Sequence, residues 1–323
     1  MDIVPVENLR SKPKLKVRIF LLAMAFMFPL LSCSSDSSEQ TLPTATPQPT
    51  TVITPSPLPA LFTLYGATLA DIPYCSTDAA TQKMDIYFPA SGGPWPVLAY
   101  VHGGSWMHGD KSEAILFAER MISQGYLVVS INYRLYPEGK FPNMIEDVKC
   151  SIRSLRAHAS EYNLDPNRIA AIGPSAGGHL VSLLGTSDAS AGWDVGEYLD
   201  QSSRVQAVVA MAPVTDLTRN FPNADIEAMR GVGFGEHNIL LASPITHVTP
   251  DDPPFLLIHG DRDEVVLYEQ SQLMYERLLQ INIPAQLVVV QNAGHSLTAP
   301  DGSATPTFDE INQIILDFLA KYL

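Results

Sequence analysis

Short apolar runs alternate with amphipathic stretches along the chain after residue 60, and this alternation restricts the fold more than any other feature of the sequence. The apolar runs predict strands at 82–88, 97–102, 127–132, 168–173, 205–211, 255–259 and 285–290, and an edge strand near 69–75 that pairs with 82–88. Consecutive apolar positions are typical of strands covered on both faces of a parallel sheet. Amphipathic patterns predict helices between the strands, at 112–124, 142–162, 176–186, 267–281 and 308–322. We therefore expect an α/β fold, with a mostly parallel, doubly wound sheet of about eight strands and helices on both faces.

The N-terminal residues have the pattern of an export signal. Five basic residues between Arg10 and Arg18 precede an uncharged, mostly apolar run from Ile19 to Leu31. This run is shorter than the ~20 residues that a membrane-spanning helix needs, and its basic flank is typical of a signal peptide. It ends in Leu-Leu-Ser-Cys at 30–33, which resembles the bacterial lipobox, where cleavage precedes a cysteine that is lipidated.

Three segments follow from this pattern. Residues 1–32 are expected to be a lipoprotein signal peptide, and 33–60 a lipidated Cys33 followed by a disordered tether rich in Ser, Thr and Pro. Residues 61–323 are expected to form the catalytic domain. The protein would then be exported and held at a bacterial membrane through its lipid anchor only. The alternative is an ordinary secretory signal with an incidental Cys33, which would leave the protein secreted.

Charge and metal-ligand patterns exclude two classes of function. Asp and Glu outnumber Lys and Arg by 34 to 20, for a formal net charge of −14, which disfavours binding to nucleic acid. The eight histidines show no H-E-x-x-H motif or paired ligand spacing, so no metal is expected. Cys75 and Cys150 either form a disulfide outside the cytoplasm or remain two buried free thiols.

A candidate nucleophile follows the strand predicted at 168–173. The chain continues as Gly173-Pro174-Ser175-Ala176-Gly177 and then enters a predicted helix. This is the G-x-S-x-G nucleophile elbow in its strand–turn–helix context, in which the glycines permit the sharp turn. Taken alone, the same residues are also compatible with a turn built from small side chains.

A candidate base and a candidate acid follow two later strands. A serine hydroxyl is a weak nucleophile and needs a base, and His295 lies after the last predicted strand. The base needs a carboxylate to orient it, and Asp263 follows the strand at 255–259. Asp261 lies closer to the strand end and is expected to brace the turn instead. The order Ser, Asp, His is that of an α/β-hydrolase.

Backbone donors for an oxyanion are expected after the strand at 97–102. The sequence there is His102-Gly103-Gly104-Ser105-Trp106, and glycines let a backbone approach the substrate oxygen closely. The N–H groups of Gly103 and Gly104, with that of Ala176, would form the hole. His102 itself is expected to be a hydrogen-bonded structural residue.

Taken together, residues 69–320 resemble the α/β-hydrolase superfamily, and within it the esterase branch related to hormone-sensitive lipase and to bifunctional feruloyl/acetyl-xylan esterases. The matching stretches are HGGSW (102–106), GDK (109–111), NYRL (132–135), FPNMIEDVK (141–149), LDPNRIAAIGPSAGGHL (164–180), HGDRDEVV (259–266) and NAGHS (292–296). The resemblance implies hydrolysis of carboxylic esters without a cofactor. It also implies Ser175 as nucleophile, Asp263 as acid, His295 as base, and Gly103 and Gly104 as the oxyanion loop.

The sequence departs from the pattern of these esterases at two positions. Ser105 stands where a third glycine is often found, which would alter the hole if that position required a glycine. Pro174 stands before the nucleophile, where it would narrow the acyl pocket. The span 214–253 is the candidate lid, although its apolar residues are equally compatible with packing onto the body of the domain. Trp106 and Trp193 either line a pocket or fill the core.

The leading prediction is a carboxylic ester hydrolase that acts on small to medium acyl esters through an acyl-enzyme. A serine peptidase or amidase of the same fold is the alternative, which the double-glycine HGGSW loop disfavours. A binding lipoprotein that has lost catalysis is a third hypothesis, and a missing triad residue would be its mark.

Overall fold

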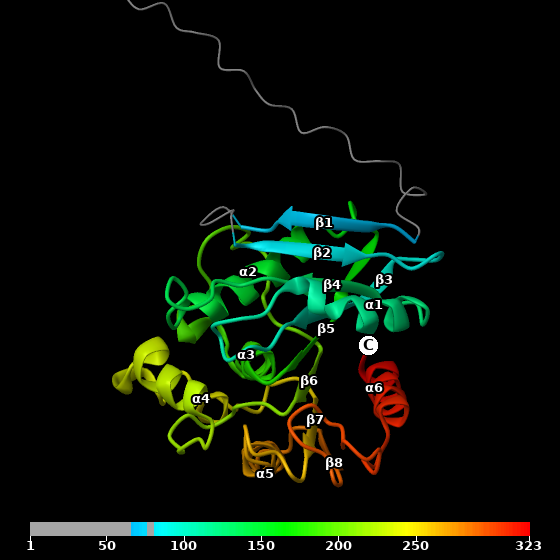
Figure 1. Ribbon diagram of the computed structural model, residues 1–323. Helices are drawn as coiled ribbons and strands as arrows, with labels where there is room; N and C mark the ends of the chain where they lie inside the picture. Colours follow the sequence, from blue (N-terminus) through cyan, green and yellow to red (C-terminus); the bar gives the residue numbers. More distant parts are fainter. Residues whose placement is uncertain (1–65, 76–80) are drawn as a thin grey trace, which may run out of the picture. The chain divides into compact units, whose positions relative to one another are not determined.

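A computed structural model describes residues 66–75 and 81–323, which all belong to one compact unit of the chain, Ser56–Leu323. Its centre is an eight-stranded sheet with the order β1-β2-β4-β3-β5-β6-β7-β8 (Figure 1). The strands are β1 Thr68–Pro73, β2 Lys83–Tyr87, β3 Trp95–Val101, β4 Leu127–Ile131, β5 Leu164–Pro174, β6 Ala207–Met211, β7 Phe255–Gly260 and β8 Ala285–Val290. Strands β3 to β8 are parallel, while β2 pairs antiparallel with both β1 and β4. The prediction of a mostly parallel, doubly wound sheet is confirmed. The predicted signal peptide, Cys33 and the tether to residue 60 lie outside the described residues.

Helices cover both faces of the sheet. In Figure 1, α1 and α6 lie on the right of the sheet, and α2, α3 and α5 lie on its other side. The α-helices are α1 Ile115–Ile122, α2 Asn143–Ala157, α3 Ala176–Thr186, α4 Ala224–Met229, α5 Glu269–Gln280 and α6 Phe308–Tyr322. Short 3-10 turns are η2 Lys111–Ala114, η3 Ala189–Ala191, η5 Glu236–Asn238 and η6 Pro244–Thr246, and a π-helical turn, η4, spans Arg230–Phe234.

Alternate residues of the central strands supply two separate cores. On β3, Val97, Ala99 and Val101 join the core beneath α2 and α3, while Leu98 and Tyr100 join the core beneath α1 and α6. Successive side chains of a strand point to opposite faces, so a strand covered on both faces must be apolar at every position. This explains the continuous apolar runs in the sequence.

One helix is shorter than its sequence pattern predicts. The pattern runs from 142 to 162, but α2 ends at Ala157. The chain leaves the helix at His158, whose backbone N–H and ring Nδ1 both donate to the Ser154 carbonyl, at 3.1 Å and 2.8 Å. Asn163 then adopts a left-handed φ of 49°, and β5 begins at the next residue, earlier than predicted.

The candidate lid mostly packs onto the domain. Phe221, Met229 and Phe234 are buried, whereas Leu240 and Leu241 are more than half exposed. Trp106 and Trp193 are also buried and fill the core. Within the described ranges, no helix is long and apolar enough to cross a bilayer.

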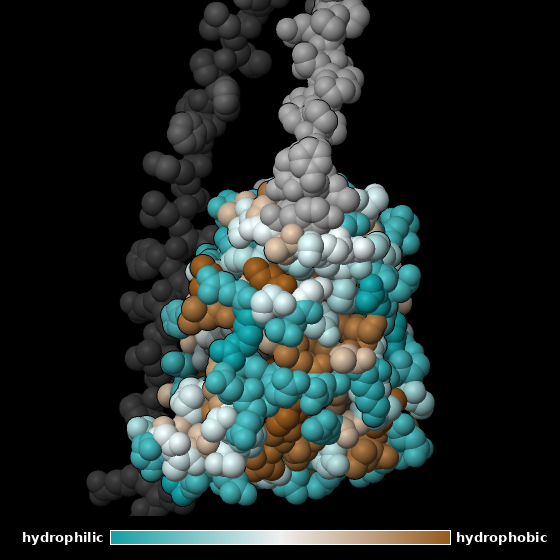
Figure 2. All heavy atoms as spheres, turned by 90° about the vertical axis from the view of Figure 1, so that its right-hand side faces the viewer, coloured by the Kyte–Doolittle hydropathy of each residue, from teal (hydrophilic) through white to brown (hydrophobic). Residues whose placement is uncertain are grey.

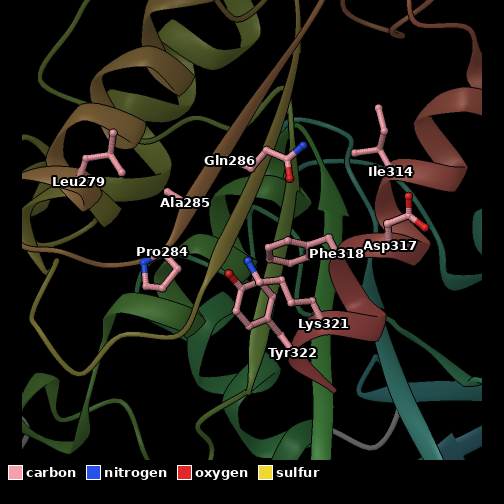
Figure 3. Close-up of a pocket in the computed structure, with 9 residues that line it drawn as sticks. All are labelled: Leu279, Pro284, Ala285, Gln286, Ile314, Asp317, Phe318, Lys321 and Tyr322. Atoms are coloured by element: carbon pink, nitrogen blue, oxygen red, sulfur yellow. The ribbon is translucent and has the colours of Figure 1, made fainter.

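A pocket of about 690 Å³ lies between α5, β8 and α6. Figure 3 shows Phe318, Lys321 and Tyr322 of α6 in it, with Pro284–Gln286 at the start of β8. This is the amino end of β8. Sites in parallel sheets form beyond the carboxyl ends of the strands, so this pocket lies at the opposite end.

A disulfide joins Cys75, just after β1, to Cys150 on α2, with 6.5 Å between the Cα atoms. It ties the antiparallel edge of the sheet to one of the helices that cover its face. Both cysteines are buried.

Removing this disulfide should destabilise the protein strongly. It closes a loop with a sequence separation of 75, for which the chain-entropy relation gives about 4.5 kcal/mol of unfolding free energy. The Cys75→Ala/Cys150→Ala protein should show this loss in urea denaturation. Wild-type protein in excess dithiothreitol should show a similar loss, and an unchanged midpoint in both samples would contradict the prediction.

Candidate active site

The predicted site residues all follow the carboxyl ends of parallel strands. Ser175 follows β5, the Gly103–Gly104 loop follows the neighbouring β3, Asp263 follows β7, and His295 follows β8. Because parallel strands end at the same edge, the fold delivers all four segments to one side of the sheet.

Ser175 occupies a sharp turn between β5 and α3. Its φ is 52° and its ψ is −118°, a conformation that a residue with a side chain rarely adopts. Two backbone bonds hold it: its N–H donates to Met211 O at 2.8 Å, and its carbonyl accepts from the N–H of His179 at 2.9 Å. The turn also needs its flanking glycines, because a Cβ on Gly173 or Gly177 would collide with the Val101 carbonyl of β3.

Asp263 and His295 are joined directly. The His295 Nδ1 donates to Asp263 Oδ2 at 2.7 Å. The other carboxylate oxygen, Oδ1, accepts from the N–H groups of Val265 at 2.8 Å and Val266 at 2.9 Å. This arrangement fixes the tautomer of the imidazole, because its Nδ1 carries the proton and its Nε2 is left free to accept one.

A second histidine supports the same carboxylate. His259 is fully buried, its Nε2 donates to Val266 O at 2.8 Å, and the same nitrogen lies 3.2 Å from Asp263 Oδ2. Its Nδ1 accepts from the Ser271 hydroxyl at 2.7 Å. We did not predict a role for His259 from the sequence. Its spacing of four residues before Asp263, within HGDRDEVV, was the available signal.

The environment of Asp263 keeps it ionised. Burial by itself raises the pKa of the carboxyl group, but the hydrogen bonds from His259 and His295, together with that of Val266 N–H, lower the pKa well below its usual range. Asp263 therefore carries a full negative charge at neutral pH beside the imidazole of His295.

The loop after β3 lies against the serine turn. A Cβ built on Gly103 would be 3.5 Å from Ser175 Cβ and 3.2 Å from Pro174 O, so the two backbones are in close contact. Three consecutive residues have positive φ: Gly104 at 101°, Ser105 at 52° and Trp106 at 59°. Ser105 therefore adopts the left-handed conformation that favours glycine, at the position where the sequence departs from three glycines.

His102 has a structural environment. It is fully buried, its Nδ1 donates to Gly103 O at 2.8 Å, and the ring of Tyr133 stacks on it at 4.4 Å. Burial is the main reason that its pKa is lowered. His102 thus braces the start of the loop.

Ser175 and His295 are not hydrogen-bonded to each other in the described part of the chain. Such bonds are often long before a substrate is bound and tighten in the complex. His295 lines a pocket together with Pro174, which precedes Ser175 in the chain, and Met211, whose carbonyl accepts from the Ser175 N–H.

This pocket has a volume of about 260 Å³ and lies on the face of the sheet covered by α1 and α6. Figure 2 views that face, where apolar side chains are exposed among hydrophilic ones. Its walls are mostly apolar and aromatic, and Glu113 and Asn312 contribute polar groups. The other lining residues are Tyr100, Leu116, Phe117, Ser296, Leu297, Phe308, Ile311 and Ile315.

Among the described residues, no group of three or more His, Cys, Asp or Glu side chains is placed to hold a metal ion.

Comparison with known proteins decides the family. The BD-FAE family model matches residues 84–278, which is more than half of the chain. The chain belongs to the BD-FAE family. The match includes the serine turn, the loop after β3 and Asp263, and it ends before His295.

Curated relatives of this BD-FAE protein include two esterases of Mycobacterium tuberculosis. Esterase LipC is 36% identical over 229 residues, which cover 66% of this chain and 55% of LipC. Esterase LipQ is 31% identical over 272 residues, covering 79% of this chain and 62% of LipQ. The chain spans about half the length of the curated relatives it matches. In the M. tuberculosis protein LipM, for example, the match covers 50% of that protein's length.

Solved structures share the fold. A truncated carbohydrate esterase from gut microbiota matches with a TM-score of 0.66 and 27% identity, over 80% of this chain and 97% of that chain. The esterase Est2 of Thermogutta terrifontis with bound butyrate matches with a TM-score of 0.68 and 26% identity, over 80% of this chain and 95% of Est2.

Replacing Asp263 with Asn should destabilise this BD-FAE protein by about 3 kcal/mol at pH 7, because a buried, hydrogen-bonded carboxylate is lost. The folded-state pKa of Asp263 is depressed, so its contribution is fully present above the unfolded pKa of about 4 and is lost as the pH falls toward the folded pKa. Urea denaturation should therefore show a smaller difference between wild type and variant at pH 3.5 than at pH 7.

The exposed Asp261 provides a matched control two residues away. Asp261→Asn should change the unfolding free energy by less than about 0.5 kcal/mol at either pH. Equal effects of the two substitutions would show that Asp263 has no special environment.

Proposed function

We propose that this protein hydrolyses carboxylic esters through Ser175, His295 and Asp263. The observation that supports this most is the 2.7 Å hydrogen bond between Asp263 and His295, on loops that meet at the edge of the sheet where Ser175 lies. His295 would take the proton of the Ser175 hydroxyl as it attacks the ester carbonyl. The imidazolium would then give this proton to the departing alcohol, leaving an acyl-enzyme.

Water would complete the cycle by the same route. His295 would remove a proton from the water as it attacks the acyl carbonyl, and would return it to Ser175 as the acid leaves. Asp263 would stay ionised throughout and stabilise each imidazolium. The low pKa of Asp263 suits that role, because a carboxyl group that took the proton could not stabilise the positive charge.

Backbone N–H groups would stabilise the oxyanion of each tetrahedral intermediate. The donors we propose are Gly103, Gly104 and Ala176. Ala176 is the first residue of α3, so its N–H has no partner within the helix. The close contact of Gly103 with Ser175 supports a hole next to the nucleophile.

We infer that the substrates are small to medium acyl esters. The pocket beside His295 is apolar but has a volume of only about 260 Å³. Structures of T. terrifontis Est2 contain butyrate and propionate, which are short acyl groups. The names of LipC and LipQ as esterases also favour ester hydrolysis over a peptidase or amidase activity.

Ser175→Ala should abolish turnover of p-nitrophenyl butyrate, with a loss on the order of 10⁴-fold or more in kcat, because no other nucleophile can form the acyl-enzyme. Wild-type protein assayed against p-nitrophenyl esters from acetate to palmitate should show kcat/KM falling with chain length. Ser190→Ala, an exposed serine on η3, should match wild type.

Three outcomes would contradict the proposal. Full activity in folded Ser175→Ala protein would remove Ser175 as nucleophile. Faster cleavage of aminoacyl anilides than of aryl acetates would make the protein an amidase. A fluorophosphonate that fails to label Ser175 in folded wild-type protein would favour a binding protein without catalysis.

We further propose that the protein is exported and anchored in a bacterial membrane by acyl chains on Cys33. The support is the sequence 30–33 at the end of an uncharged run with a basic flank. In a bacterial host given radiolabelled palmitate, wild-type protein should carry the label and appear in the membrane fraction. Cys33→Ser should lose both, and an unlabelled wild type would favour secretion instead.

A further inference from the structure

A buried histidine connects three segments around the proposed oxyanion hole. His179 lies on α3, four residues after Ser175, and is fully buried. Its Nδ1 accepts from the indole Nε1–H of Trp106, at 3.1 Å, and its Nε2 donates to the Ala242 carbonyl, at 2.7 Å. Trp106 lies in the loop after β3, and Ala242 belongs to the candidate lid. This chain of two hydrogen bonds is called the His179 bridge below.

Donor and acceptor rules define the His179 bridge completely. An indole N–H can only donate and a carbonyl can only accept, so His179 must be neutral, with its proton on Nε2. Burial supports this state, because it lowers the pKa of His179 to about 4. The bridge therefore has one arrangement at neutral pH.

The loop that the bridge holds is strained. Gly104, Ser105 and Trp106 all have positive φ, and the last two carry side chains that disfavour this conformation. Such a conformation persists only where several contacts with the surrounding structure hold the backbone in it. The loop has backbone restraints from Met107 and His108 N–H to Gly104 O, and from Tyr136 N–H to Trp106 O. The bridge is the side-chain restraint that ties it to α3.

The aromatic packing brings the same three segments together. Phe234 of the candidate lid has its ring centroid 4.9 Å from that of Trp106 and 5.4 Å from that of His179, both in edge-to-face geometry. The rings of Trp106 and His179 are themselves 5.1 Å apart and perpendicular. Packing of this kind leaves the indole little freedom to move once its N–H is bonded.

We propose that His179 is a positioning residue, which acts through Trp106 to hold the Gly103–Gly104 loop at the distance from Ser175 that an oxyanion requires. This inference rests on the proposed ester hydrolysis. His179 touches no substrate; it sits on the helix that begins at the nucleophile, so loop and nucleophile share one anchor. Loss of the bond to Trp106 would let the strained loop relax and weaken the oxyanion hole.

Two substitutions of His179 separate its two hydrogen bonds. Asn places its oxygen near the position of Nδ1, so His179→Asn keeps an acceptor for Trp106. Gln places its amide nitrogen near the position of Nε2, so His179→Gln keeps the donor to Ala242. Each variant loses one buried bond, and both should lose a similar amount of thermal stability. A purely structural role therefore predicts equal activities.

We expect His179→Gln and Trp106→Phe to lower kcat for p-nitrophenyl butyrate by roughly tenfold or more, with KM within about twofold of wild type, because an oxyanion interaction acts in the transition state. His179→Asn should keep kcat within about threefold of wild type. The Ki of n-butylboronic acid, whose serine adduct is tetrahedral, should rise in parallel with the loss of kcat.

Trp193→Phe is the matched control, because Trp193 is a second buried tryptophan, packed on Phe141 and His247 rather than on the loop. It should keep the wild-type kcat and Ki. Equal kcat in the Asn and Gln variants, or a wild-type kcat in Trp106→Phe, would overturn the role of His179. That result is distinguishable from failure of the proposed function, in which Ser175→Ala would remain active.

Discussion

Backbone-to-backbone contact at the carboxyl edge of the sheet is the constraint on which the site depends. Gly173 and Gly177 leave no room for a side chain against the Val101 carbonyl of β3, and Gly260 leaves none against the carbonyls of Ala293 and Gly294. The first contact sets the serine turn beside the loop after β3. The second sets the loop of Asp263 beside the loop of His295. Both are possible only where glycine removes the Cβ atom.

The buried polar groups of Asp263 and His179 have defined partners. Asp263 accepts hydrogen bonds from two backbone N–H groups and from His295, and His259 lies within 3.2 Å of it. His179 accepts one hydrogen bond from the Trp106 indole N–H, which can only donate. It donates another to the Ala242 carbonyl, which can only accept. Burying a polar group without such partners costs about 1–3 kcal/mol, so these networks favour one arrangement over its alternatives. The surrounding hydrogen bonds and packing hold the strained turns at Ser175 and Ser105–Trp106 in place.

Sequence patterns predicted the strands well because both faces of the sheet are covered, which forces apolar residues at successive positions. The same patterns predicted α2 too long, because the apolar spacing continues past Ala157, whereas the backbone leaves helical geometry at His158. They also did not resolve the span 214–253, where a short helix, a π-helical turn and 3-10 turns follow one another. His259 and His179 were missed because each acts through a partner that is distant in the chain.

The sequence by itself determined the layer architecture, the order of the serine, aspartate and histidine segments, and the presence of a glycine-rich loop, because these follow from hydrophobic period and local turn chemistry. Only the tertiary structure decided which groups meet. It paired Asp263 rather than Asp261 with His295, bonded Cys75 to Cys150, and placed Trp106 on His179. Those contacts depend on how loops from different strands pack against one another, and such packing has no periodic signal in the chain.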